Sequence, residues 1–151
     1  MMNKKVKRVI LGAAVVTVLF AAWYCLILKA PISLSSEIAN QLNGSSDFSI
    51  VSIEEMEADK TPIFANINSS SSECDEILNE IGSAQIVYKE DEIGVVLEGK
   101  LYSISIKSET GDETMSFTLN NKNELHINNN EKTYSLKDDK LYNLCSELTY
   151  S

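Results

Sequence analysis

The sequence predicts an α+β fold, in which an N-terminal transmembrane helix is followed by an antiparallel β-sheet meander with two amphipathic helices packed on one face. Three observations lead to this prediction. A long uncharged apolar run lies near the start of the chain, short segments of alternating apolar and polar residues fill its second half, and two segments repeat apolar residues at helical spacing. The expected parts are a basic tail at 1–8, a transmembrane helix at 9–28, a polar stalk at 29–46 and an α+β domain at 47–151.

The expected transmembrane helix is Val9–Leu28, which contains no charged residue. Twenty residues at about 1.5 Å each form a helix of roughly 30 Å, which matches the hydrocarbon core of a bilayer. A cleaved signal peptide is the alternative, but its apolar core is shorter and Pro31 disfavours cleavage after Ala30. A lipoprotein anchor at Cys25 is disfavoured because the bulky Tyr24 precedes it. We therefore expect a retained membrane anchor.

The charges on the two sides of this run predict its orientation. Residues 1–8 carry four cations, whereas Lys29 is the only cation at the other end before a long acidic segment. Since the more cationic flank stays in the cytoplasm, everything after Lys29 is expected outside the cell. The expected location is the cell membrane, with a single pass, a cytoplasmic N-terminus and an extracytoplasmic C-terminal domain.

The part of the chain after position 36 is strongly acidic. It holds all twenty-two carboxylates against eight lysines and no arginine, a net charge of −14 with histidine neutral. Nucleic acid and anionic lipid surfaces need cations that neutralise phosphate, so neither is an expected partner of this domain. The expected partners are membrane lipid, through residues 9–28, and another envelope or membrane protein. No cofactor is expected.

Alternating apolar and polar residues predict the strands of the sheet. In 101–107, Tyr102, Ile104 and Ile106 alternate with serines, and 114–119 follows the same pattern after a Gly- and Asp-containing turn. Short strands separated by such turns are typical of an antiparallel meander with one buried and one solvated face. The other expected strands are 47–58, 61–67, 84–89, 92–98, 124–128 and 132–136.

Two segments have the apolar spacing of amphipathic helices. The first is expected to begin at Ser72, a capping residue, and to end at Gly82. Its apolar stripe consists of Cys74, Ile77, Leu78 and Ile81. The second begins at Asp138 or Asp139, and its stripe consists of Leu141, Leu144, Cys145 and Leu148. A further short helix at 36–42 is compatible with the stalk.

Cys74 and Cys145 are the candidate disulfide, because both lie on the apolar stripes of helices that should pack on the same sheet face. Outside the cytoplasm such a bridge persists, and closing a loop of about 70 residues stabilises a fold by roughly 4 kcal/mol. The alternative is that both thiols are free and pack as small apolar side chains. Two cysteines do not decide between these interpretations.

Catalytic and metal-binding candidates are few. His126 is the only histidine, and it alternates with Leu125 and Ile127, so it is expected on the solvated face without a catalytic role. Paired carboxylates could serve glycoside hydrolysis or calcium binding, but none has the spacing of an EF-hand loop. The acidic clusters are Glu54-Glu55, Glu90-Asp91-Glu92, Asp112-Glu113 and Asp138-Asp139. The sequence therefore assigns no catalytic, cofactor or metal residue.

The chain resembles small single-pass membrane-anchored extracytoplasmic proteins of Gram-positive bacteria. The segment HINNNEKTYSLKDDKLYNLCSEL at 126–148, in which a short strand leads into an amphipathic helix, is similar to uncharacterised domains of that group. This resemblance implies an extracytoplasmic domain and carries no catalytic residues. Type IV pilins share the outline of an apolar helix and an α/β head, but Val9–Leu28 lacks the glutamate that they carry early in the helix.

These observations together indicate a membrane-anchored extracytoplasmic binding or adaptor domain without catalytic activity. Tyr134, Tyr142 and Tyr150 are a candidate recognition surface, with packing in the core as the alternative. Two other functions stay open: an inhibitor or immunity-type protein that acts through an acidic face, and a small envelope enzyme that uses carboxylates.

Overall fold

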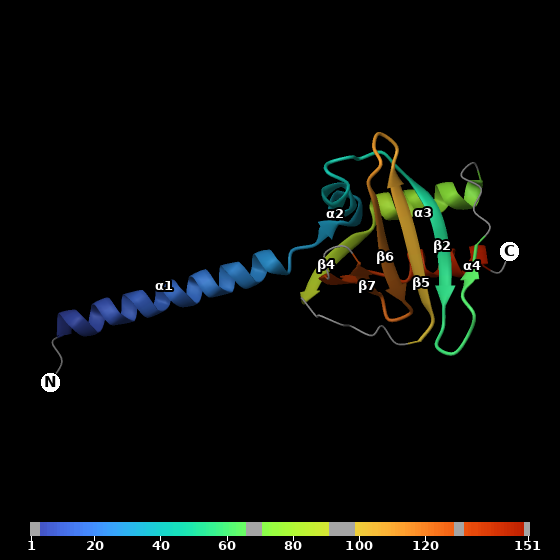
Figure 1. The fold of residues 1–151 in the computed structure, drawn as a ribbon. Helices are drawn as coiled ribbons and strands as arrows, with labels where there is room; N and C mark the ends of the chain where they lie inside the picture. The colour runs from blue at the N-terminus through green and yellow to red at the C-terminus, as the bar shows by residue number, and fades with distance from the viewer. Residues whose placement is uncertain (1–3, 66–70, 91–98, 129–131, 150–151) are drawn as a thin grey trace. The chain divides into compact units, whose positions relative to one another are not determined.

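The computed structural model describes residues 4–65, 71–90, 99–128 and 132–149, and the chain forms two compact units, Met1–Ala30 and Pro31–Ser151 (Figure 1). The first unit is the helix α1, Lys4–Leu28. Helical conformation is therefore confirmed for Val9–Leu28. Among the residues that the structure describes, no helix is long and apolar enough to cross a membrane.

The second unit contains one antiparallel sheet of eight strands in the order β1-β4-β8-β7-β6-β5-β2-β3. The strands β5 to β8 are sequential neighbours, which confirms the predicted meander, and β2 and β4 extend it on its two sides. The sheet ends in the two-residue strands β1 and β3. The bounds are β1 Ile32–Ser33, β2 Phe48–Met56, β3 Ile63–Phe64, β4 Gln85–Glu90, β5 Leu101–Ser108, β6 Thr114–Asn120, β7 Glu124–Ile127 and β8 Lys132–Leu136. The strand expected at 92–98 lies outside the described residues.

One face of the sheet carries the hydrophobic core. The alternation predicted for β5 is confirmed, since Tyr102, Ile104 and Ile106 are fully buried. They pack in one cluster with apolar side chains of three helices: α2 (Leu34–Gln41), α3 (Ser72–Ser83) and α4 (Lys140–Thr149). In Figure 1, α3 and α4 lie behind the sheet. The α+β class is thus confirmed, with three helices in this core instead of the predicted two.

The third helix, α2, lies in the segment that was predicted to be a stalk. Leu34, Ile38 and Leu42 follow each other at intervals of four residues, and each is at most 1 % exposed. Just before them, Ile32 in β1 pairs with Ile86 in β4, so the backbone of this segment belongs to the sheet. The stalk at 29–46 and the domain start at residue 47 were wrong, because Leu34, Ile38 and Leu42 are enough to bury one face of α2 and its C-cap in the core. The compact unit begins at Pro31.

The predicted helix starts were close to those observed. In α3 the capping residue is Ser71 instead of Ser72, and its hydroxyl oxygen accepts a hydrogen bond from the backbone N–H of Cys74. The helix continues through Gly82 and ends at Ser83, so the predicted stop at Gly82 was one residue early. In α4 the carboxylate of Asp138 accepts a hydrogen bond from the backbone N–H of Lys140, the first residue of the helix.

Candidate functional site

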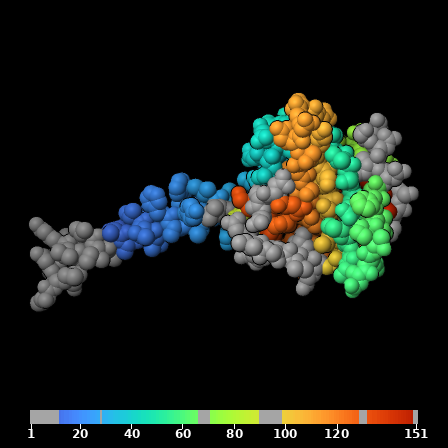
Figure 2. Space-filling view, in the orientation of Figure 1, coloured from blue at the N-terminus to red at the C-terminus, as the bar shows by residue number. Residues whose placement is uncertain are grey.

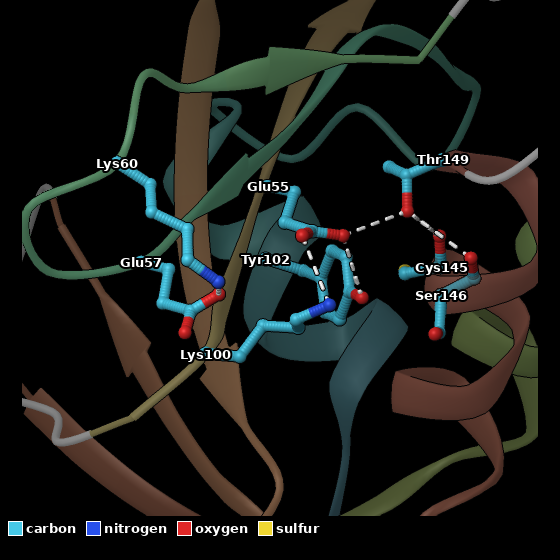
Figure 3. Close-up of polar contacts among 8 residues, drawn as sticks. All are labelled: Glu55, Glu57, Lys60, Lys100, Tyr102, Cys145, Ser146 and Thr149. Atoms are coloured by element: carbon cyan, nitrogen blue, oxygen red, sulfur yellow. Dashed lines mark hydrogen bonds and ion pairs between the residues drawn. The ribbon is translucent and has the colours of Figure 1, made fainter.

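A buried polar cluster surrounds Glu55 on β2 (Figure 3). Two residues after the core residue Ile53, Glu55 points to the same side of the sheet, and it is only 5 % exposed. Its carboxylate forms an ion pair with Lys100 at 2.9 Å and accepts a hydrogen bond from the Tyr102 hydroxyl at 3.0 Å. The Thr149 hydroxyl, from the end of α4, lies 3.1 Å from the same carboxylate.

These donors keep Glu55 ionised. Burial alone raises the pKa of the Glu55 carboxyl, but the hydrogen bonds from Lys100, Tyr102 and Thr149 and the charge of Lys100 outweigh burial and hold the pKa below its ordinary value. Burial, with a smaller contribution from the neighbouring carboxylate, raises the pKa of Tyr102, so its hydroxyl stays a donor. The cluster is therefore an anion surrounded by donors, and its carboxylate is ionised near neutral pH.

The Glu55 cluster connects the last turn of α4 to the sheet. Glu55 and Tyr102 face each other on neighbouring strands, whereas Thr149 comes from the C-terminal helix. The Thr149 hydroxyl lies within hydrogen-bonding distance of Glu55 and of the backbone carbonyls of Cys145 and Ser146 in the preceding turn of α4. This geometry fits a structural role that fixes α4.

A second buried carboxylate lies between α3 and α4. Glu80 is 7 % exposed and forms an ion pair with Lys140, whose pKa it raises by accepting a hydrogen bond. Two hollows of about 290 and 420 Å³ flank the pair, at the low end of the range for small-molecule sites. Their shared lining is Glu80, Ser83 and Lys140. Since Glu80 and Lys140 neutralise each other, the hollows contain no excess charge from this pair.

The candidate disulfide is not present in the structure. Cys74 and Cys145 are both buried and both have free thiols. Burial raises the pKa of Cys145 to about 12, so its thiol is protonated and unreactive near neutral pH. In the structure both cysteines are therefore free thiols packed in the interior, which is the alternative to the disulfide. Cys25, on α1, is exposed.

His126 lies on β7, on the face opposite the buried Leu125 and Ile127, which confirms its predicted side of the sheet. It is half-buried rather than fully solvated, because Thr118 and Thr133 flank it on the neighbouring strands. Its Nδ1 lies 3.3 Å from the hydroxyl of Thr133. Among the described residues, no group of three or more His, Cys, Asp or Glu side chains could hold a metal ion.

The acidic clusters are dispersed over separate elements. Asp112 and Glu113 lie in the β5–β6 turn, where Asp112 contacts Lys107 and Glu113 accepts a hydrogen bond from Asn43. Asp138 caps α4, as described above. The side chains of Glu90-Asp91-Glu92 lie outside the described residues. No two described clusters share a contact that would make a catalytic carboxylate pair.

Of the tyrosines expected at a recognition surface, the two that the structure describes pack against other residues. Tyr134 is 2 % exposed, and its hydroxyl donates to Glu37 on α2 at 3.1 Å. Tyr142 is partly buried and packs edge-on against Tyr102, with ring centroids 4.9 Å apart. Tyr150 lies outside the described residues. The packing alternative is therefore the correct one for Tyr134.

Exposed apolar side chains are concentrated at one edge of the sheet. Four large apolar side chains are exposed in the described part of the domain, and three of them lie in β2 and β3: Val51 at 56 %, Ile63 at 46 % and Phe64 at 66 %. The fourth, Ile32, lies in β1 at the opposite edge. Figure 2 shows the green atoms of the β2–β3 hairpin at the surface. We call Val51, Ile63 and Phe64 the apolar edge.

Comparison of the chain with protein-family models, with curated proteins and with solved structures finds no match. The Glu55 cluster and the apolar edge were both missed by the sequence analysis. A signal existed for each: Glu55 follows Ile53 by two residues, which places a carboxylate on the core face, and Phe64 lies in a short segment that begins with Pro62, a residue typical of edge strands.

Proposed function

We propose that this protein is a single-pass membrane-anchored binding or adaptor domain, which presents a surface outside the cell to another envelope or membrane protein and performs no catalysis of its own. The proposed anchor is the whole uncharged run Val9–Leu28, including residues 9–11 and 28, whose side chains lie outside the described part. The cations of residues 1–8 favour a cytoplasmic N-terminus.

The apolar edge is the observation that carries the binding function. In the described part of the domain most large apolar side chains are buried or packed against one core, yet Val51, Ile63 and Phe64 are 46 to 66 % exposed in neighbouring strands. Large apolar groups exposed at one edge of a sheet, here on both faces of β3, are what an interaction site offers to a partner. An adaptor needs such a patch, whereas an enzyme needs titratable groups that converge in a hollow.

The anchor can be tested by extraction of membranes that contain the full-length chain. Alkaline carbonate releases peripheral proteins and leaves spanning proteins in the membrane pellet. We expect the full-length chain in the pellet, and a variant lacking residues 9–28 in the supernatant. Release of the full-length chain would contradict the anchor.

Binding can be tested by crosslinking in the native membrane. We expect the full-length chain to capture one protein reproducibly, and the double variant Val51→Ser, Phe64→Ser to capture much less of it. The matched control is Ile32→Ser, which removes the exposed apolar side chain of the other edge strand and should not change the yield. Equal yields from all three chains would refute a role of the apolar edge in binding.

A further inference from the structure

We propose, on the basis of the binding function above, that the edge strand β3 accepts an extended basic segment of the partner as an additional β-strand. The candidate occupant is a stretch of polypeptide in which apolar residues alternate with lysine or arginine. Three observations on the described residues carry this inference: the direction of the backbone groups of β3, the side chains on its two faces, and the charges of the adjoining hairpin.

The backbone of Phe64 points away from the sheet. In β3, Phe64 is opposite Glu54 and Ile63 is opposite Glu55, so the next residue, Ala65, is opposite Ile53. The N–H of Ala65 donates to the carbonyl oxygen of Ile53 at 2.9 Å, which makes this a hydrogen-bonded pair. Since hydrogen-bonded and non-hydrogen-bonded pairs alternate in antiparallel sheets, the N–H and C=O of Phe64 are directed to the outer side of β3.

That outer side is the end of the sheet as far as the structure describes it, since β3 is the last strand in the order. A donor and an acceptor on the same residue of an edge strand are what an added antiparallel strand pairs with. The opposite edge strand, β1, differs because the backbone groups of its exposed apolar residue, Ile32, point into the sheet. Leu34 N–H donates to Ala84 C=O, so two residues earlier the backbone groups of Ile32 face β4 and are used inside the sheet.

The side chains of β3 offer apolar contacts on both faces of an added strand. Residues opposite each other in a ladder point to the same face of the sheet. The side chains of Phe64 and Glu54 therefore lie on the face opposite the core, and those of Ile63 and Glu55 lie on the core face. Phe64 is 66 % exposed and Ile63 is 46 % exposed. An added strand would place one alternate set of its side chains beside Phe64 and the other beside Ile63.

The charges of the hairpin favour a basic segment. Lys60 pairs with Glu57 at 2.7 Å, and Lys100 pairs with Glu55 at 2.9 Å. Within the described part of the chain, no cation is paired with Glu54, which lies directly beside Phe64. An added strand would lie two strand spacings, about 10 Å, from β2, a distance that a lysine or arginine side chain can span to bring its charge near Glu54. An acidic segment would therefore be rejected where a basic one is accepted.

The inference can be tested with the full-length protein in nanodiscs of neutral phosphatidylcholine, which do not attract basic peptides. The probes are two fluorescently labelled eight-residue peptides, one alternating valine with lysine and one alternating valine with glutamate, and binding is measured by fluorescence anisotropy. We expect the valine–lysine peptide to bind at least about tenfold more tightly than the valine–glutamate peptide, with the difference reduced at high salt. Equal binding of both peptides would overturn the charge argument.

Three variants separate the backbone from the side chain. Phe64→Pro removes the outward N–H and the ring, and it leaves the β2–β3 hydrogen bonds in place, because this N–H is not used by β2. Phe64→Ala removes the ring alone. We expect Phe64→Ala to weaken binding of the basic peptide, Phe64→Pro to weaken it by a further factor of about ten, and Ile32→Ala to leave it unchanged. Binding by Phe64→Pro that equals binding by Phe64→Ala would overturn strand addition.

This experiment distinguishes failure of the inference from failure of the proposed function. If the peptides do not bind, while crosslinking in the native membrane still captures one partner that depends on Val51 and Phe64, strand addition is wrong and the binding function stands. If neither the peptides nor a partner is bound, both are wrong. If the captured partner is joined at position 64 through a segment with alternating lysine or arginine, both are supported.

Discussion

Replacing Tyr102 with phenylalanine removes one hydroxyl group from the Glu55 cluster and leaves the ring contact with Tyr142 in place. The hydroxyl donates to a carboxylate that is 5 % exposed, over 3.0 Å, and the Tyr102 side chain is itself fully buried. A hydrogen bond to a charged group contributes about 1.5–3 kcal/mol, and the burial of the Tyr102 side chain limits the access of water to this position. We therefore expect the free energy of unfolding to fall by about 2 kcal/mol in Tyr102→Phe.

The assay is urea unfolding of the full-length protein in detergent micelles, followed by near-ultraviolet circular dichroism. The matched control is Tyr134→Phe, which removes the same hydroxyl group from a bond of nearly the same length to Glu37, at 3.1 Å. Since Glu37 is only half-buried, water can take the place of the lost donor. We expect Tyr134→Phe to lose about 1 kcal/mol or less.

The pH dependence of this loss of stability tests whether the Tyr102 hydroxyl stabilises the ionised form of Glu55. The pKa of Glu55 in the folded state lies below 4.5, its ordinary value, so its charge stabilises the fold above that pH, and this stabilisation is lost as the pH falls through the folded pKa. Without the Tyr102 hydroxyl, burial is opposed by fewer donors, and the pKa of Glu55 rises. The difference between wild type and Tyr102→Phe should be large at about pH 7 and smaller at about pH 3.5. An equal difference at both values would refute stabilisation of the charged carboxylate.

Three further predictions concern the cysteines, the domain limits and the histidine. Cys74 and Cys145 should both be labelled by a maleimide in denaturant without reductant and resist labelling in the folded protein, because both are free and buried; absence of labelling in denaturant would show a bridge. A chain of residues 31–151 should give a dispersed amide NMR spectrum, and a chain of residues 47–151, which lacks α2, should not. His126→Ala should change the free energy of unfolding by less than about 1 kcal/mol and leave partner crosslinking unchanged, as checked by urea unfolding and crosslink yield.

The meander was predictable because every second residue of strands such as β5 points into the core. Tyr102, Ile104 and Ile106 alternate with serine, and such alternation reports both the strand and the face that points to the core. The stripes of α3 and α4 were predictable for the same reason, since Ile77, Ile81 and other apolar residues recur at helical spacing. In each case the spacing of apolar residues within one segment is enough to predict the element and its buried face.

The Glu55 cluster was not predictable because its parts come from distant segments. Glu55 and Tyr102 meet only through the pairing of β2 with β5, and Thr149 is 94 positions from Glu55. The sequence places a carboxylate on the core face of β2 but does not show which donors satisfy it. The edge position of Phe64 depends in the same way on strand order, since β3 is the last described strand of the sheet.

The domain start at Pro31 changes what the proposed anchor implies. A stalk of residues 29–46 would reach about 60 Å when extended, whereas Lys29 and Ala30 alone reach about 7 Å. With so short a connection, the proposed function places the partner in the same membrane or at its surface. Inserting sixteen Gly and Ser residues between Ala30 and Pro31 restores the reach of a stalk. We expect this insertion to lower the crosslinking yield with the native partner, because a longer flexible linker dilutes the domain over a larger volume. An unchanged yield would show that the partner does not have to be close to the membrane.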